Sequence, residues 1–262
     1  MCGRYAASAS ADLLVETFEV DEVVTGAGDG TDAPPPWQLP RWNIAPTDPV
    51  AVVMDRAVKD SDEVTRKLAG LRWGLVPSWS KELPTRAPLI NARLETVAEK
   101  PSFRRPMAAR RCLLPADGYY EWYTLDDGPA TPRAKPRKQP FYIRPSSGLM
   151  VMAGLYEFWR DPTKDREADD AWVISCCIIT TAATDDLGQI HDRMPVQVPA
   201  AHVDEWLDPS LTDAEAAKAL LHVPEPGEMT AYAVSTAVNA VRNDGPELVE
   251  PLPDEPAEGV LV

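Results

Sequence analysis

Residues 112–123, Cys-Leu-Leu-Pro-Ala-Asp-Gly-Tyr-Tyr-Glu-Trp-Tyr, form an apolar and aromatic run typical of a β-strand. Other runs of this kind occur at 50–54, 67–75, 139–144, 150–156, 172–181 and 228–234. The chain also contains 27 prolines, about twice the ~5% average share, and these divide it into short elements. Many short strands and few helices predict one α+β domain with a β-rich, barrel-like core and short peripheral helices.

The segments between these strands are expected to hold short helices and two surface inserts. Helices are predicted at 11–19, 94–100, 200–207 and 212–221, with Thr212 as the N-cap of the last. The inserts are 24–40, rich in Gly, Asp and Pro, and 124–138, which holds an Asp-Gly turn and several prolines. We expect a single domain over 2–240, followed by an acidic, proline-rich tail over 241–262 that is loosely ordered from Pro246 onward.

The composition is that of an ordinary globular protein, with 262 residues of which 44% are hydrophobic and 26% charged. A chain of this length can bury a substantial core without disulfides or a structural metal. Its four cysteines and three histidines lack zinc-ligand spacing, so we expect no metal and no cofactor. The longest apolar stretch, 172–183, is too short to span a membrane, and no secretory signal is visible. These features predict a cytoplasmic protein.

The net charge of −15 disfavours general binding to nucleic acid, but the charge is unevenly distributed. Residues 64–111 carry eleven Lys or Arg against three Glu, a local net charge of +8. The acidic residues gather in 12–32, in 157–170 and from Asp244 onward. A basic segment on an acidic protein indicates either a local anionic ligand or simply an unevenly charged surface.

The chain begins Met1-Cys2-Gly3-Arg4-Tyr5, and removal of the initiator methionine would make Cys2 the first residue. Such a cysteine carries an α-amine and a thiol, whose unperturbed pKa values of ~8 and ~8.5 leave a reactive fraction of each near neutral pH. The amine can condense with an aldehyde to an imine, and the thiol can then close a five-membered thiazolidine on the imine carbon. Taken alone, this opening is also compatible with an ordinary second residue or with the cysteine nucleophile of a glutamine amidotransferase.

Further motifs follow in order: Asn-Ile-Ala-Pro-Thr (43–47), Arg-Trp-Gly-Leu-Val-Pro-Ser-Trp (72–79), Asn-Ala-Arg-Leu-Glu-Thr (91–96), Gly-Tyr-Tyr-Glu-Trp (118–122) and His-Asp-Arg-Met-Pro (191–195). With these behind Cys2, the chain resembles the SRAP (SOS response-associated peptidase) family, which includes abasic site processing proteins. The motifs are scattered over 2–198, about three quarters of the chain, and in combination they are highly specific. The resemblance implies a single α+β domain that crosslinks abasic sites in single-stranded DNA.

Three residues in these motifs are catalytic candidates beside Cys2. Glu121 lies between aromatic residues, where burial would raise its pKa and suit it to proton transfer. His191 can exchange protons near pH 7, and Asn91 offers a fixed hydrogen-bonding group. The resemblance implies that Glu121 contacts the N-terminal amine, that His191 assists opening of the sugar to its aldehyde, and that Asn91 supports Cys2. Without the motifs, they would be an arginine-paired carboxylate, a loop histidine and a turn asparagine.

Single-stranded DNA is held by basic grooves and by the stacking of bases on aromatic side chains. Arg4 and Arg93 fall in the family motifs, and we predict that they contact phosphates beside the lesion. Charge alone adds the weaker candidates Arg72, Arg104 and Arg105.

Two tryptophans and one proline are candidates for contacts with the bases. Trp73 and Trp79 are predicted to stack on bases, although a tryptophan belongs more often to a core. The resemblance implies that the loop 43–47 bends the strand, with Pro46 as a wedge.

Three functions are compatible with these residues, and we rank them in the order given. The first is an enzyme that protects abasic sites in single-stranded DNA by forming a DNA–protein crosslink, a thiazolidine on Cys2. The second is a Cys2-dependent thiol hydrolase or autopeptidase in which the α-amine acts as base. The third is a non-catalytic single-strand binding module. We expect a monomer whose partner is single-stranded DNA with abasic sites and which is nucleoid-associated when bound to DNA.

Overall fold

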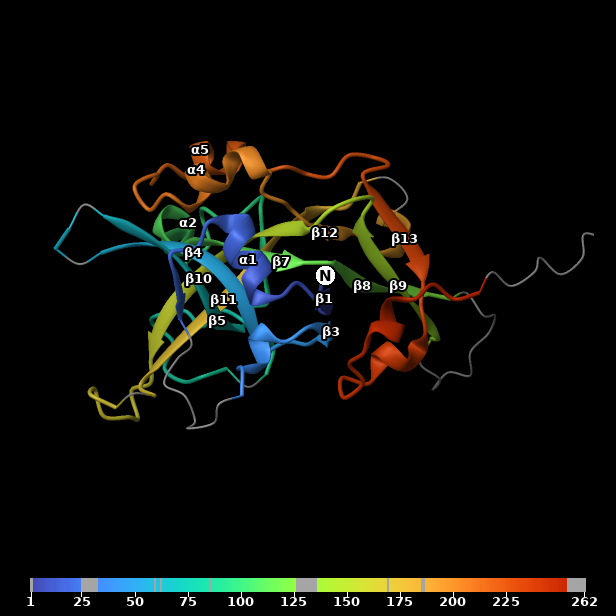
Figure 1. Cartoon of the computed structure of the whole chain (residues 1–262), viewed down its shortest axis with the longest axis horizontal. Coiled ribbons are helices and arrows are strands. Elements are labelled where there is room, and N and C mark those ends of the chain that lie inside the picture. Colours follow the sequence, from blue (N-terminus) through green and yellow to red (C-terminus); the bar gives the residue numbers. More distant parts are fainter. Residues whose placement is uncertain are drawn as a thin grey trace, which may run out of the picture.

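The computed structural model describes residues 2–24, 33–58, 60–61, 63–84, 86–125, 136–168, 170–184 and 187–253. Their strands form two sheets (Figure 1). The smaller sheet has the order β13-β9-β8-β1-β3 and consists of β1 (Tyr5–Ala7), β3 (Arg41–Ile44), β8 (Gly118–Thr124), β9 (Lys138–Pro145) and β13 (Met229–Ala233). The larger sheet has the order β12-β11-β10-β7-β4-β5-β2, with β6 paired to β11, and consists of β2 (Glu22–Val24), β4 (Pro49–Ala57), β5 (Val64–Trp73), β6 (Asn91–Arg93), β7 (Arg111–Ala116), β10 (Met150–Arg160), β11 (Trp172–Ala182) and β12 (Arg193–Pro195).

Five strands of the larger sheet close into a barrel. Strands β11, β10, β7, β4 and β5 follow one another in an antiparallel ladder, and β11 also pairs in parallel with β5, where Cys176 lies opposite Trp73. Closure leaves these five strands without a free edge. In Figure 1 the barrel strands lie on the left, the smaller sheet lies on the right, and the N-terminus lies between them. The predicted α+β fold with a barrel-like core is confirmed.

The run 112–123 is two strands rather than the single strand expected from its sequence. Its first half belongs to β7 in the barrel, the chain turns at Asp117, and its second half belongs to β8 in the smaller sheet. Asp117 holds this turn in two ways. Its backbone N–H donates to the carbonyl of Ala6 at 2.8 Å, and its carboxylate accepts from the backbone N–H of Ser8 at 2.7 Å. The contacts that bend the run are therefore made by β1 and the residue after it, which are distant in sequence.

Strand β8 brings one of the sequence motifs to the start of the chain. It pairs antiparallel with β1, with Tyr119 opposite Tyr5, so that Glu121 lies beside the residues that precede β1. On its other side β9 comes unusually close, because a Cβ at Gly118 would stand 2.6 Å from the carbonyl oxygen of Ile143. Only glycine allows this approach.

Short helices complete the fold. They are α1 (Ala11–Phe18), α2 (Arg104–Ala109), α3 (Leu187–Ile190), α4 (Val203–Leu207) and α5 (Ala214–Ala219), with 3-10 helices η1 (Pro36–Gln38), η2 (Ala200–His202), η3 (Thr236–Asn239) and η4 (Pro246–Val249). The helices expected at 11–19 and 200–207 are confirmed, the second as η2 followed by α4. None of the helices in the described ranges combines the length and apolar character that a bilayer span needs.

Two helix predictions need correction. No helix covers 94–100: the N–H of Leu94 donates to the carbonyl of Thr180 in β11 at 2.8 Å, which extends the pairing of β6, and turns then lead to α2. In α5 the N-cap is Asp213 rather than Thr212, because the Asp213 carboxylate accepts from the backbone N–H groups of residues 215 and 216. A charged acceptor at this position also interacts favourably with the helix dipole.

The residues expected to form a loose tail are ordered as far as 253. Leu248 in η4 is buried, Pro251 forms a bridge with Val234, and Asp244 accepts hydrogen bonds from the backbone of β3. The expected loose order is therefore wrong for these residues, because a buried leucine and strand contacts tie them to the smaller sheet, while the domain boundary expected at 240 stays a prediction. Residues 254–262 lie outside the described residues.

Much of the two expected inserts also lies outside the described residues, namely 25–32 and 126–135. The described part of the first insert is more than a surface loop. Trp37 in η1 lies so close to β5 that a Cβ at Gly70 would come within 2.1 Å of its ring. The indole ring can therefore pack against the barrel at this position because Gly70 has no side chain.

Candidate functional site

Cys2 is fully buried and belongs to a core cluster that also contains Tyr5 and Trp73. Its carbonyl oxygen accepts a hydrogen bond from Nδ2 of Asn91 at 2.9 Å, which fixes the backbone at the beginning of the chain. Burial raises the pKa of the Cys2 thiol far above its usual value, and the negative charge of Glu121 acts in the same direction. At neutral pH the sulfur is therefore a protonated thiol.

Asn91 reaches Cys2 because β6 is tied to the barrel. This short strand pairs in parallel with β11, with Asn91 opposite Ile178. While Nδ2 holds Cys2, Oδ1 of Asn91 is buried and accepts no hydrogen bond from the described residues. An unsatisfied buried acceptor is costly, so this oxygen is suited to accept a hydrogen bond from a bound molecule.

Glu121 is buried in β8, on the strand next to β1. Burial raises the pKa of its carboxyl to about 7, although the positive charge of the amino terminus acts in the opposite direction. The carboxyl group can therefore both give and take a proton near neutral pH, as a general acid–base requires.

His191 follows α3, which packs on β8. The backbone N–H of Arg193 donates to Nδ1 at 3.1 Å, and the exposed carboxylate of Asp192 lies at the same distance from this atom. Burial lowers the pKa of the imidazole, and the positive charge of the amino terminus acts in the same direction. The ring is therefore neutral at pH 7, with Nδ1 as acceptor and the proton on Nε2. Nδ1 can accept from the Arg193 N–H only when it carries no proton, whereas an ion pair with Asp192 needs a protonated ring. The lowered pKa of His191 favours the hydrogen bond from Arg193.

These positions bring together the four residues predicted for catalysis. Asn91 contacts Cys2 directly, Glu121 acts on its thiol through charge, and His191 follows α3, which packs on the strand that carries Glu121. They come from β6, β8 and the loop after α3, which are joined only by the tertiary fold.

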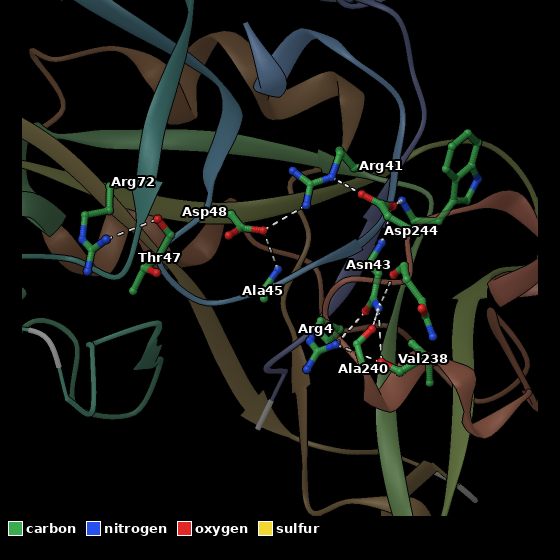
Figure 2. A network of polar contacts seen from close by, with 12 residues as sticks. Arg4, Arg41, Asn43, Ala45, Thr47, Asp48, Arg72, Val238, Ala240 and Asp244 are labelled. Carbon is green, nitrogen blue, oxygen red and sulfur yellow. Dashed lines mark hydrogen bonds and ion pairs between the residues drawn. The ribbon is translucent and has the colours of Figure 1, made fainter.

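Arg4 lies beside this group, but much of its guanidinium is used inside the protein (Figure 2). Its Nη1 donates to Oδ1 of Asn43 at 2.7 Å and to the carbonyl of Val238 at 3.0 Å. The guanidinium also lies over the ring of Trp122, 5.8 Å from its centroid. Nε of Arg4 is buried and has no hydrogen-bond partner among the described residues. Arg4 is thus held in one orientation with donors left for a ligand.

The loop 43–47 is held by η3 and the segment that follows it. Asn43 is buried, and its Nδ2 donates to three carbonyl groups there, at residues 238, 240 and 243. Asp244 accepts from the backbone N–H groups of Trp42 and Asn43 and pairs with Arg41 (Figure 2). Sequence reasoning missed Asp244, because its partners lie about 200 positions earlier in the chain. Pro46, at the tip of this loop, is half-buried, and its role as a wedge stays a prediction.

The two tryptophans predicted to stack on bases differ in exposure. Trp73 is fully buried, donates from Nε1 to the carbonyl of Ile90 at 3.1 Å, and packs edge to face against Tyr5 with centroids 5.1 Å apart. The stacking role of Trp73 is therefore wrong, because neither face of its ring reaches the solvent. Trp79 is 65% exposed and Arg93 is exposed on β6, so their contacts with DNA stay predictions.

Much of the basic segment 64–111 serves the fold. Arg66 pairs with Asp55 and Asp204, and Arg110 pairs with Glu157. Among the described residues, the buried Arg111 donates to backbone carbonyls only, and Arg72 donates to the carbonyls of residues 47 and 84. The local charge of +8 thus overstates the charge available to an anionic ligand. Arg104 and Arg105 are exposed on α2. The described residues contain no cluster of metal-ligating side chains.

Comparison with known proteins identifies relatives over nearly the full length of the chain. It is 37% identical over 251 residues to the abasic site processing protein YoqW of Bacillus subtilis (strain 168), which covers 95% of this chain and 99% of the relative. It is 31% identical over 289 residues to the abasic site processing protein HMCES of Pongo abelii, which covers 96% of this chain and 76% of the relative.

Solved structures share the fold. A protein from Bacteroides thetaiotaomicron has a TM-score of 0.69 at 24% identity, over 96% of this chain and 100% of that one. A phage-related protein from Bordetella bronchiseptica has a TM-score of 0.59 at 30% identity, over 89% of this chain and 94% of that one. The family model described as SOS response associated peptidase (SRAP) matches residues 1–241, which contain Cys2 and every motif around it. The chain therefore belongs to the SRAP family.

Proposed function

We propose that this protein binds abasic sites in single-stranded DNA and forms a covalent crosslink to them through Cys2, once Met1 has been removed. The relatives named abasic site processing proteins support the choice of substrate. The observation that carries the chemistry is the placement of Cys2 beside Asn91 and Glu121, since a buried carboxyl with a pKa of about 7 can move the protons that imine formation requires.

The covalent reaction begins with the α-amine of Cys2. Its lone pair attacks the aldehyde carbon of the ring-opened abasic sugar, and loss of one water from the carbinolamine leaves an imine. The thiol then adds to the imine carbon: a C–S bond closes the five-membered ring, and the thiol proton passes to the nitrogen. Overall one water is released, and no oxidant or reductant is needed.

The raised pKa of the Cys2 thiol favours this order of events. A protonated thiol is a poor nucleophile towards the aldehyde, so the amine reacts first. Glu121 takes the amine proton and returns it to the departing hydroxyl, while the neutral His191 can donate from Nε2 to a sugar oxygen. Oδ1 of Asn91 can accept from a sugar hydroxyl. We assign contacts with the flanking strand to Arg4, Arg93, Trp79 and Pro46.

A peptidase or other thiol hydrolase is the second candidate, because the family is described as SOS response associated peptidase. Such an enzyme needs a thiolate near neutral pH. The burial of Cys2 raises the pKa of its thiol instead, which disfavours this function.

The crosslink is tested directly with a single-stranded oligonucleotide that carries one abasic site. Mature protein should give a band that survives denaturing electrophoresis, and its intact mass should equal that of protein plus DNA minus one water. An otherwise identical intact oligonucleotide is the control. Turnover of peptides without any adduct would contradict the proposal and favour the hydrolase.

Replacing Asn91 with alanine should slow adduct formation about tenfold, because it removes one hydrogen bond that holds Cys2 and one acceptor for the sugar. The rate is measured from the appearance of the denaturation-resistant band under single-turnover conditions. Thr96→Ala, a half-buried polar residue in the turn after β6, is a matched control and should react like the wild type. An unchanged rate for the Asn91 variant would show that Asn91 has no part in the reaction.

A further inference from the structure

A hollow lies on the same face of the smaller sheet as Glu121. In the pairing of β8 with β9, Glu121 is opposite Phe141. Because alternate residues of a strand share a face, Tyr123 follows Glu121 on this face towards the end of β8. The sheet therefore continues from the proposed catalytic carboxyl directly into an aromatic surface.

This surface forms one wall of a hollow of about 500 Å³, within the size range of ligand sites. We call it the aromatic hollow and define it by its lining residues: Tyr123, Phe141, Leu187, Gln189, Ile190 and Ala231. The rings of Tyr123 and Phe141 meet edge to face, 6.4 Å apart, and Tyr123 is 38% exposed. Residues of α3 form another wall, and this helix leads directly to His191. One wall of the hollow thus contains the strand that carries Glu121, and the other contains the helix that precedes His191.

A positive charge lies where β9 begins and β8 ends, one residue beyond Tyr123. Lys138 is exposed at the start of β9, opposite Thr124 of β8. Its charge lowers the pKa of both Glu121 and His191, which places it within electrostatic reach of both. A cation here is unusual on a chain with a net charge of −15, and it suits a phosphate beside the reacting sugar.

We propose that the aromatic hollow receives the base of a nucleotide adjacent to the abasic site, with Lys138 against the phosphate that joins them. This inference rests on the proposed function. An abasic sugar offers no base of its own, so stacking energy must come from its neighbours. Every base has a π-face, which makes an aromatic wall tolerant of sequence. An apolar peptide would fill the hollow equally well, but it gives no reason for the cation or for the direct connection to Glu121.

The test uses oligonucleotides in which a tetrahydrofuran replaces the abasic sugar, since this analogue cannot open to an aldehyde and so reports non-covalent affinity. Tyr123→Ala should weaken binding about tenfold, the loss expected from one stacked base. Removing the base from one flanking nucleotide should weaken wild-type binding by a similar factor and leave the Tyr123→Ala protein unaffected. Tyr123→Phe should bind like the wild type. Trp172→Ala is the matched control, because Trp172 is an exposed aromatic residue (53%) at the start of β11, whereas the other end of this strand pairs with β12 next to His191.

Two results would overturn the aromatic hollow as a base site. The first is that Tyr123→Ala binds as tightly as the wild type. The second is that removing the flanking base weakens binding of the Tyr123→Ala protein as much as it weakens binding of the wild type. Adduct yield on the true abasic oligonucleotide at saturating DNA separates this result from failure of the proposed function. If wild type forms the adduct while the affinities are unchanged, only the aromatic hollow is refuted. If wild type forms no adduct, the proposed function fails whatever the affinities.

Discussion

Replacing Cys2 with serine is expected to abolish the denaturation-resistant crosslink. Serine keeps the α-amine, so an imine can still form with the sugar aldehyde, but no thiol is present to close the thiazolidine. The adduct should then appear only when borohydride reduces the imine to an amine. Wild-type protein should give a stable band with or without the reductant, as measured by denaturing electrophoresis.

An extension of the chain ahead of Cys2 should have a larger effect, because it converts the α-amine into an amide that cannot form an imine. Neither the stable nor the borohydride-trapped band should appear, while binding to the tetrahydrofuran oligonucleotide should still be measurable. Cys112→Ala is the matched control, since Cys112 is equally buried in the same core cluster. Stable adduct from the extended protein would show that another group attacks the sugar.

Replacing Glu121 with glutamine is expected to change the pH dependence of stability by about 3 kcal/mol. The folded protein raises the pKa of Glu121 from 4.5 to about 7, so its folded form binds the proton more tightly than the unfolded chain does. The stability from this group is fully present below pH 4.5 and is lost as the pH rises through 7, at about 1.4 kcal/mol per unit of pKa difference. Glutamine does not titrate and avoids this loss.

The measurement is urea unfolding of both proteins from pH 4 to pH 8. The unfolding free energy of the glutamine variant, relative to wild type, should rise between about pH 4.5 and pH 7 and level off above pH 7. Glu95→Gln is the control without this dependence, because the hydrogen bonds from Arg193 lower the pKa of Glu95 to about 2, so its contribution changes only below pH 4.5 and should be nearly constant across the measured range. A pH-independent difference for the Glu121 variant would mean that its carboxyl titrates normally in the folded protein.

The amino-acid sequence was sufficient to predict the class of fold and most strands. Nearly continuous apolar runs such as 150–156 and 172–181 became β10 and β11, because local β-propensity and burial agree there. The sequence also singled out Cys2, Asn91, Glu121 and His191 as catalytic candidates, since each lies in a motif with its own chemical reason, and their catalytic roles stay predictions. Short strands such as β1 and β6 were not predicted, because three residues carry too little periodicity to be recognised without their partners.

Other features of the fold depend on contacts between residues that are far apart in the sequence, so local patterns could not predict them. The run 112–123 gives no local indication that it leaves the barrel at Asp117, since the hydrogen bonds that bend it come from β1 and the residue after it. Trp73 resembles a stacking platform in its motif, but the closure of β11 on β5 buries it. Likewise, Asp244 lies in an acidic stretch that resembles a solvated tail, and only the folded chain brings it to Arg41 and the backbone of β3.

The sequence by itself therefore determined which chemical groups this candidate site has: the thiol of Cys2, a carboxyl, an imidazole and an amide. The fold decided their properties. Burial of Glu121 between strands moves its pKa to neutrality, and burial of Cys2 keeps its sulfur protonated. The physical reason is that desolvation depends on everything packed around a group, and those neighbours come from every part of the chain.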